Sequence, residues 1–235
     1  MSETELTLAE ASAAVDTAGW RVVLGSVLAA VPVASLSQAL QVAQAAAAAC
    51  GADGDHLRID VRAERVELSL QTAAAGERIR ERTGITARDA ELAAAVTAAV
   101  HGLGLRLVPP TGTGRPVQRL EICIDALDIP AVRPFWLAVL GMVPEPGHDE
   151  PAAAVVDPVW QLPAVWFQQM DEPRRQRNRI HFDIAVPHED AEARVQAALD
   201  AGGTLVSDAA ARAFWILADP EGNEVCVCTW QDRDY

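Results

Sequence analysis

The chain has 235 residues, half of them hydrophobic, and a formal net charge of −14 at neutral pH. This length is enough for two domains that each bury a core. The negative charge argues against mainly electrostatic binding to nucleic acid or to an anionic membrane, because phosphate binding needs clustered cations. We therefore expect a small-molecule ligand as partner, with no nucleic acid and no membrane.

Three features indicate the cellular setting. No cationic segment precedes an apolar core at the start of the chain, and no run approaches the roughly 18 apolar residues of a membrane helix. The four cysteines do not form a disulfide framework. All 19 basic residues are arginine and alanine runs are frequent, which is typical of a GC-rich bacterial genome. We expect a bacterial, cytoplasmic protein with reduced thiols.

The first half of the chain predicts helices and strands in the order αββαββα. Capping boxes begin helices after Thr7 and Ser35, and Thr86 caps a third. Alternating apolar and polar residues indicate a hairpin with a turn at residues 63–64. Helices are expected at about 8–18, 36–50 and 87–101, and strands within 20–33 (two, around Gly25), at 57–61 and at 65–72.

Residues 106–117 hold three prolines and two glycines. Proline blocks both helix and central strand, and glycine loosens the backbone. We place a linker at 106–117, between domains at 1–105 and 118–235.

The helix that begins GITARDAELAAAV and the preceding strand VELSLQT resemble the pterin-4a-carbinolamine dehydratase family over roughly residues 5–104. That family's active site is a doubled histidine followed by proline before the first strand of the hairpin, with a third histidine after the second strand. The doubled histidine falls here on Asp55 and His56, the proline on Leu57 and the third histidine on Ala73. One histidine of three is kept.

Dehydrating a carbinolamine requires a proton donor and a base, and imidazole suits both roles because it titrates near neutral pH. Asp55 and His56 could divide these roles, whereas Ala73 can do neither. The alternative is that His56 is an exposed loop histidine, in a domain kept as a scaffold or dimerisation unit. We expect the domain to be inactive, with dehydration through His56 as the alternative.

The second half predicts two βαβββ modules in tandem, which gives an α+β fold overall. The first has the strand LEICIDAL, a helix that ends at Gly141, and strands at 152–156 and 164–169. The second has the strand RIHFDIAV, a helix at about 189–201, and three short strands around Leu205, Trp215 and Val225.

This pair, with FWLAVLGM after the first strand and ADPEGNEVCV in the last hairpin, resembles the glyoxalase-like branch of the vicinal oxygen chelate superfamily over residues 118–232. The resemblance implies a cavity with metal-ligand positions on the first and last strand of each module. These positions fall on Glu121, on Phe167 or Gln168, on His181 and on Cys226.

Strand parity places Glu121 on the same face as Cys123, His181 on the same face as Asp183, and Cys226 on the same face as Cys228. A site of Glu121, His181 and Cys226 would suit zinc better than magnesium, because sulfur is a soft ligand, and the divalent metal expected is zinc or iron. No cofactor is certain, because a buried cysteine is also a common core residue. His181 has three alternatives: metal ligand, general base, or a cavity histidine that orients a bound molecule.

Tryptophan is abundant in this half, and a flat apolar ring with one polar edge suits aromatic ligands. Trp160 and Trp166, on either side of Pro163, are the cavity candidates. The DPEGN sequence at 219–223 predicts a tight hairpin in which Asp219 accepts backbone hydrogen bonds. The predicted ligand-binding residues are Trp160, Trp166, Gln168, Asp183 and Cys226.

The leading hypothesis is a small-molecule-binding protein or enzyme of the glyoxalase-like type, with the ligand near Glu121, His181 and Trp166. One alternative is a metal-dependent lyase, isomerase or dioxygenase that uses Glu121, His181 and Cys226. The other is a 4a-hydroxytetrahydrobiopterin dehydratase that uses His56. If the protein is an enzyme we expect a lyase, and by analogy with both families we expect a homodimer.

Overall fold

The computed structural model describes residues 4–72, 85–109, 119–145, 150–174, 176 and 178–232. Contacts divide the chain into two compact units, residues 1–119 and 120–235, and each has its own hydrophobic core. Both units mix helices with strands, so the predicted α+β class is confirmed. Residues 110–117 of the predicted linker lie outside the described residues, and its bounds stay a prediction.

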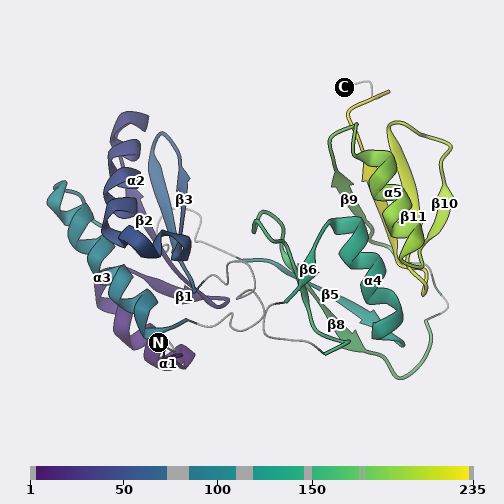
Figure 1. Ribbon diagram of the computed structural model, residues 1–235, viewed down its shortest axis with the longest axis horizontal. Helices are drawn as coiled ribbons and strands as arrows, with labels where there is room; N and C mark the ends of the chain where they lie inside the picture. Colours follow the sequence, from purple (N-terminus) through teal and green to yellow (C-terminus); the bar gives the residue numbers. More distant parts are fainter. Residues whose placement is uncertain are drawn as a thin grey trace. The chain divides into compact units, whose positions relative to one another are not determined.

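The N-terminal unit is one antiparallel four-stranded sheet with helices packed on it, in the predicted order αββαββα (Figure 1). The sheet order is β1-β2-β4-β3. Its elements are α1 (Leu8–Val15), the 3₁₀ turn η1 (Asp16–Ala18), β1 (Arg21–Val23), β2 (Ser26–Pro32), α2 (Leu36–Cys50), the 3₁₀ segment η2 (Gly51–His56), β3 (Leu57–Val61), β4 (Arg65–Leu70) and α3 (Ala87–Gly102).

The helix starts follow from capping. Thr7 and Glu10 form the predicted box, because the Thr7 N–H donates to the Glu10 carboxylate at 2.9 Å and the Glu10 N–H donates to the Thr7 hydroxyl at 3.3 Å. The box predicted at Ser35 is only half formed. The Gln38 N–H donates to Ser35 Oγ at 3.2 Å, but the Gln38 side chain accepts from the N–H of Ala34, one residue earlier than predicted.

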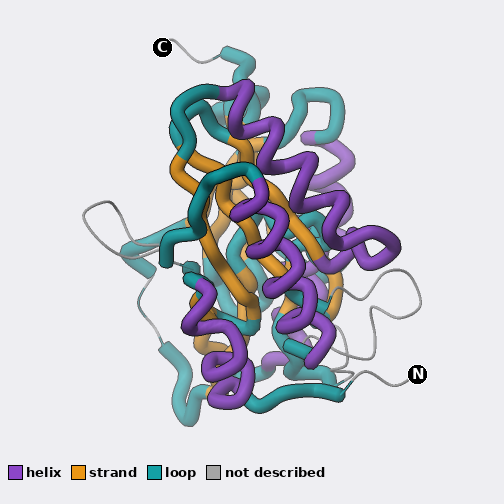
Figure 2. Tube along the Cα trace, turned by 90° about the vertical axis from the view of Figure 1, so that its left-hand side faces the viewer, coloured by secondary structure: helices purple, strands orange, loops and turns teal. Residues whose placement is uncertain are grey.

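The core of this unit lies between the sheet and the helices. β4 alternates half-buried and buried residues, and its buried set, which includes Leu68, packs with Val42 of α2 and Val96 of α3. Figure 2 shows the helices in front of the strands of this sheet. The sheet therefore presents one face to α2 and α3, and the start of α3 reaches the end of β4.

The C-terminal unit holds two βαβββ modules, each with a four-stranded sheet (Figure 1). The sheet orders are β5-β8-β7-β6 and β9-β12-β11-β10, and in each module the first strand pairs in parallel with the last. The elements are β5 (Glu121–Ala126), α4 (Ile129–Leu140), β6 (Val143–Pro144), β7 (Val155–Val156), β8 (Ala164–Gln169), β9 (Phe182–Ala185), α5 (Ala191–Asp200), β10 (Thr204–Ser207), β11 (Phe214–Ala218) and β12 (Glu224–Cys228).

Most of these elements agree with the sequence prediction, including the end of α4 at Gly141, whose φ of 65° is left-handed. The strand predicted at 152–156 is wrong in length, since β7 has only two residues, and the two-residue β6 was not predicted. The reason is that β6 contains Pro144, which lacks an N–H, so this edge of the sheet forms few ladder bonds.

The two modules share one core. Helices α4 and α5 pack together, and the Trp136 ring of α4 lies edge-on to Phe182 of β9 with centroids 5.9 Å apart. Residues Ile122 and Ile124 of β5 face this core, so Glu121 and Cys123 face the opposite side of the sheet. Within the described residues, no helix is long and apolar enough to cross a membrane.

Candidate functional sites

His56 lies at the end of η2 and is buried against α3. Its side chain is 7% exposed, and its Nδ1 lies 2.8 Å from the Oδ1 of Asp89, which has no exposed surface. The interpretation of His56 as an exposed loop histidine is therefore wrong. The burial of His56 could not be predicted from local sequence, because its partner Asp89 lies 33 residues away on α3.

Asp89 holds His56 as part of a buried network. Its second oxygen accepts from the Thr86 N–H and from the Thr72 hydroxyl, each at 2.7 Å. An ionised carboxylate can only accept, so beside an ionised Asp89 the proton of this pair lies on His56 Nδ1. Asp89 was missed as a site residue, although it belongs to the GITARD motif that the sequence singled out.

The other predicted positions around His56 differ in burial. Asp55 is exposed in η2, and Leu57 begins β3 in place of the family's proline. Ala73 lies outside the described residues. Of the positions carried over from the family, His56 is therefore the one that lies in a buried polar network among the described residues.

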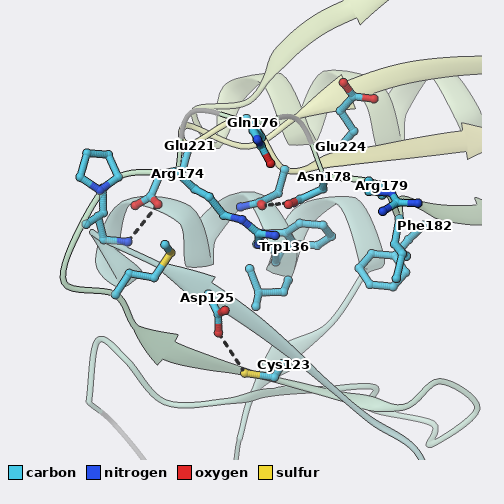
Figure 3. Close-up of a pocket in the computed structure, with 17 residues that line it drawn as sticks. Cys123, Asp125, Trp136, Arg174, Gln176, Asn178, Arg179, Phe182, Glu221 and Glu224 are labelled. Atoms are coloured by element: carbon cyan, nitrogen blue, oxygen red, sulfur yellow. Dashed lines mark hydrogen bonds between the residues drawn. The ribbon is translucent and has the colours of Figure 1, made fainter.

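A pocket of about 530 Å³ lies in the C-terminal unit, where the two modules meet (Figure 3). β5 contributes Cys123 and Asp125, whose side chains are joined by an S–H···O contact of 3.8 Å. Burial, reinforced by the Asp125 carboxylate, raises the pKa of the Cys123 thiol. The lining further contains Ile124, Leu127, Trp136, Met170, Pro173, Arg174, Gln176, Asn178, Arg179, Ile180, Phe182, Glu221, Gly222, Asn223 and Glu224.

The turn at 219–223 builds one wall of this pocket. Asp219 is 2% exposed and accepts from the N–H groups of Glu221 and Asn223, both at 2.9 Å, as the DPEGN motif predicts. It also accepts from the Trp136 indole N–H at 3.0 Å. Glu221 in turn accepts from the backbone N–H groups of Leu127 and Asp128 at the start of α4. These hydrogen bonds hold the turn against α4, at its start and at Trp136.

Described residues of the connection between the modules also line this pocket, which the sequence prediction missed, and the Asn178 amide donates to the Asn223 side chain of the turn at 2.6 Å. Residues 173–179 read PRRQRNR, so seven residues hold four of the chain's 19 arginines. Arg174 and Arg179 line the pocket, and neither guanidinium has a hydrogen-bond or ion-pair partner among the described residues. The concentration of arginine in an acidic chain was the signal that could have identified this segment.

Several predicted ligand-binding residues lie elsewhere. Glu121 is exposed at the start of β5, Trp166 is 40% exposed on the open face of β8, and Gln168 is on that same face. Trp160 lies in a turn organised by Asp157, with a left-handed φ of 58°. None of these four lines the pocket, so their roles in ligand binding stay predictions.

His181, Asp183 and Cys226 lie together on the sheet face of the second module that points away from its core. Their ligand-type atoms are all within 4.8 Å of one another, and the His181 Nε2 is 3.4 Å from an Asp183 oxygen. His181 and Asp183 are about half exposed, whereas Cys226 is 6% exposed. Burial raises the pKa of the Cys226 thiol to about 12, and its hydrogen bond to the Asp183 carboxylate adds to the increase.

The metal-ligand set implied by the family resemblance fits this geometry only in part. His181 and Cys226 are close enough to share an ion, but Glu121 belongs to no such group among the described residues. Phe167 is buried in the core, where its ring offers no ligand atom. Asp183 stands instead beside His181 and Cys226, and an imidazole, a carboxylate and a thiol are donors that zinc accepts.

Comparison with known proteins agrees with both resemblances. The family profile described as pterin 4 alpha carbinolamine dehydratase matches residues 4–99, and the profile described as glyoxalase-like domain matches residues 121–228. The chain is therefore a fusion of a dehydratase-like and a glyoxalase-like domain. No curated protein sequence matches the chain.

Solved structures similar to each domain include two of interest. A glyoxalase/bleomycin resistance protein from Albidiferax ferrireducens T118 is 20% identical, with 46% of this chain and 95% of that chain covered and a TM-score of 0.37. A transcriptional coactivator/pterin dehydratase from Brucella melitensis is 21% identical. The match covers 41% of this chain and 98% of that chain, with a TM-score of 0.35.

Proposed function

We propose that the protein binds a small molecule in the pocket between the two modules of its glyoxalase-like domain. The observation that carries the proposal is the pocket itself, whose volume of about 530 Å³ falls in the range of small-molecule sites. Its floor is the fixed indole of Trp136 beside Phe182, and Arg174 and Arg179 supply polar groups at its rim. Such a lining suits a planar, partly apolar ligand with polar substituents.

We expect that filling the pocket weakens binding. A panel of small aromatic and heterocyclic metabolites is screened against the full-length protein by thermal shift, and hits are titrated by calorimetry. Cys123→Trp adds a ring inside the pocket and is expected to raise the Kd of a hit by about tenfold or more. Glu121→Trp adds the same ring two residues away on the same strand face, outside the pocket, and is expected to leave the Kd within about twofold.

The reverse result would place the ligand elsewhere. If Glu121→Trp weakened binding and Cys123→Trp did not, the ligand would lie on the open face of β5 and β8 near Trp166. That outcome would contradict the pocket and support the position predicted from the sequence.

Carbinolamine dehydration by the dehydratase-like domain is the second candidate, and the buried pair of His56 and Asp89 favours it. A base that is oriented by a buried carboxylate has the arrangement that general acid–base catalysis requires. If this domain is active, His56→Ala is expected to lower kcat about 10²–10⁴-fold, the usual contribution of one such group.

Dehydration of a pterin carbinolamine is followed spectrophotometrically with full-length protein. His101→Ala, at the exposed end of α3, is the matched control and is expected to keep full activity. If the His56→Ala variant kept full dehydratase activity, His56 would not be the catalytic base and this second candidate function would be wrong.

Metal-dependent chemistry with Glu121 as a ligand is the weakest of the three hypotheses. Glu121 is not grouped with His181 and Cys226, so no observation favours that ligand set. A homodimer also stays a prediction.

A further inference from the structure

The register of the second module brings three metal-ligand side chains to one point. β9 and β12 are parallel neighbours, and Asp183 pairs directly with Cys226. Neighbouring strands lie about 4.8 Å apart, so side chains of a direct pair on one face are in reach of each other. His181 is two residues before Asp183 and projects to the same side. All three residues therefore come from the second module.

The spacing of the donor atoms is close to that of a tetrahedral zinc site. Zn–S and Zn–N bonds of about 2.3 and 2.0 Å put two ligand atoms about 3.5 Å apart. His181 Nε2 and the Asp183 carboxylate are already 3.4 Å apart, and no pair in the group exceeds 4.8 Å. Because the side chains of His181 and Asp183 are about half exposed, a change of rotamer can close the remaining gap of roughly 1 Å.

The burial of the three residues suits a site that opens to solvent. Cys226 supplies sulfur from the sheet, while His181 and Asp183 reach over it from the exposed side. Three protein ligands leave one position of a tetrahedron for solvent or for a bound molecule. A soft sulfur donor favours zinc over magnesium or calcium, which take oxygen ligands.

We propose that His181, Asp183 and Cys226 form a zinc site built on the second module alone. The site differs from the set implied by the family resemblance, because Asp183 replaces Glu121 and the first module supplies no ligand. None of the three residues lines the ligand pocket. The proposal therefore does not depend on the proposed function.

Metal binding to the full-length, tag-free protein tests the site without any activity assay. The protein is freed of metal with a chelator and titrated with Co²⁺, whose charge-transfer absorption reports a cobalt–thiolate bond, and with Zn²⁺ against a chromophoric chelator. We expect one equivalent of each ion and a thiolate band. Cys226→Ser is expected to abolish the band.

Two pairs of variants separate this site from its alternatives. Asp183→Asn and His181→Asn change exposed side chains, so the fold is kept, and each is expected to weaken Zn²⁺ binding about 100-fold or more, since even residues that only orient ligands contribute 10–100-fold. Glu121→Gln and Cys228→Ser are the matched controls and are expected to leave affinity unchanged. Absence of a thiolate band in the unmodified protein, or an equal loss in Glu121→Gln and Asp183→Asn, would overturn the assignment.

Discussion

Replacing Asp89 with alanine is expected to lower the free energy of unfolding of the dehydratase-like domain by about 3–5 kcal/mol, because several buried donors lose their acceptor at once and each unsatisfied donor costs about 1–3 kcal/mol. Asp89 has no exposed surface and is the shared acceptor for His56, Thr72 and Thr86. The alanine variant leaves the Thr86 N–H and the imidazole without their acceptor in a place that water does not reach. It also opens a void beneath α3.

Calorimetry of the full-length protein measures this effect, because the two domains are expected to unfold as separate transitions. A loss of 1 kcal/mol lowers the Tm of a domain of this size by roughly 4–8 °C, so the first-domain transition should fall by more than about 12 °C. Glu91→Ala, on the same helix but 65% exposed, is the control, with an expected change below about 0.5 kcal/mol. Similar shifts for Asp89→Ala and Glu91→Ala would mean that the buried network does not stabilise the domain.

The sequence predicts those elements best whose ends depend on neighbouring residues. Local signals placed the helices and most strands, because capping at Thr7 and the left-handed Gly141 act within a few residues. The two-residue strands β6 and β7 were misjudged, since their extent depends on which neighbours they meet in the sheet. Periodicity carries no information about that pairing.

The candidate sites were less predictable, because each depends on contacts between distant segments. Strand parity correctly put His181 and Asp183 on one face, but the position of Cys226 opposite Asp183 requires the parallel register of β9 and β12. His56 was assigned to an exposed loop because its carboxylate partner lies on α3. The pocket residues Arg174, Asn178 and Arg179 come from a connection whose sequence has no helix or strand pattern, so no local signal links them to Trp136.

Replacing Asp219 with alanine is expected to lower the free energy of unfolding of the glyoxalase-like domain by about 3–5 kcal/mol, because several buried or half-buried donors lose their acceptor at about 1–3 kcal/mol each. Asp219 joins the 219–223 turn to the indole of Trp136, which is 1% exposed. Without it, the Trp136 N–H loses its acceptor, and the turn loses the hydrogen bonds from Glu221 and Asn223. We therefore expect the second calorimetric transition to fall by more than about 12 °C while the first stays in place.

The effect should extend to the pocket, because the turn forms one wall and Trp136 forms the floor. Hydrogen exchange is expected to rise in two segments far apart in the chain, residues 219–224 and the start of α4, where Glu221 accepts from two backbone N–H groups. Asp208→Ala, an exposed aspartate of the same domain, is the control and should change neither quantity. Faster exchange confined to the turn would show that Asp219 shapes only its own hairpin and that the pocket floor is held by packing instead.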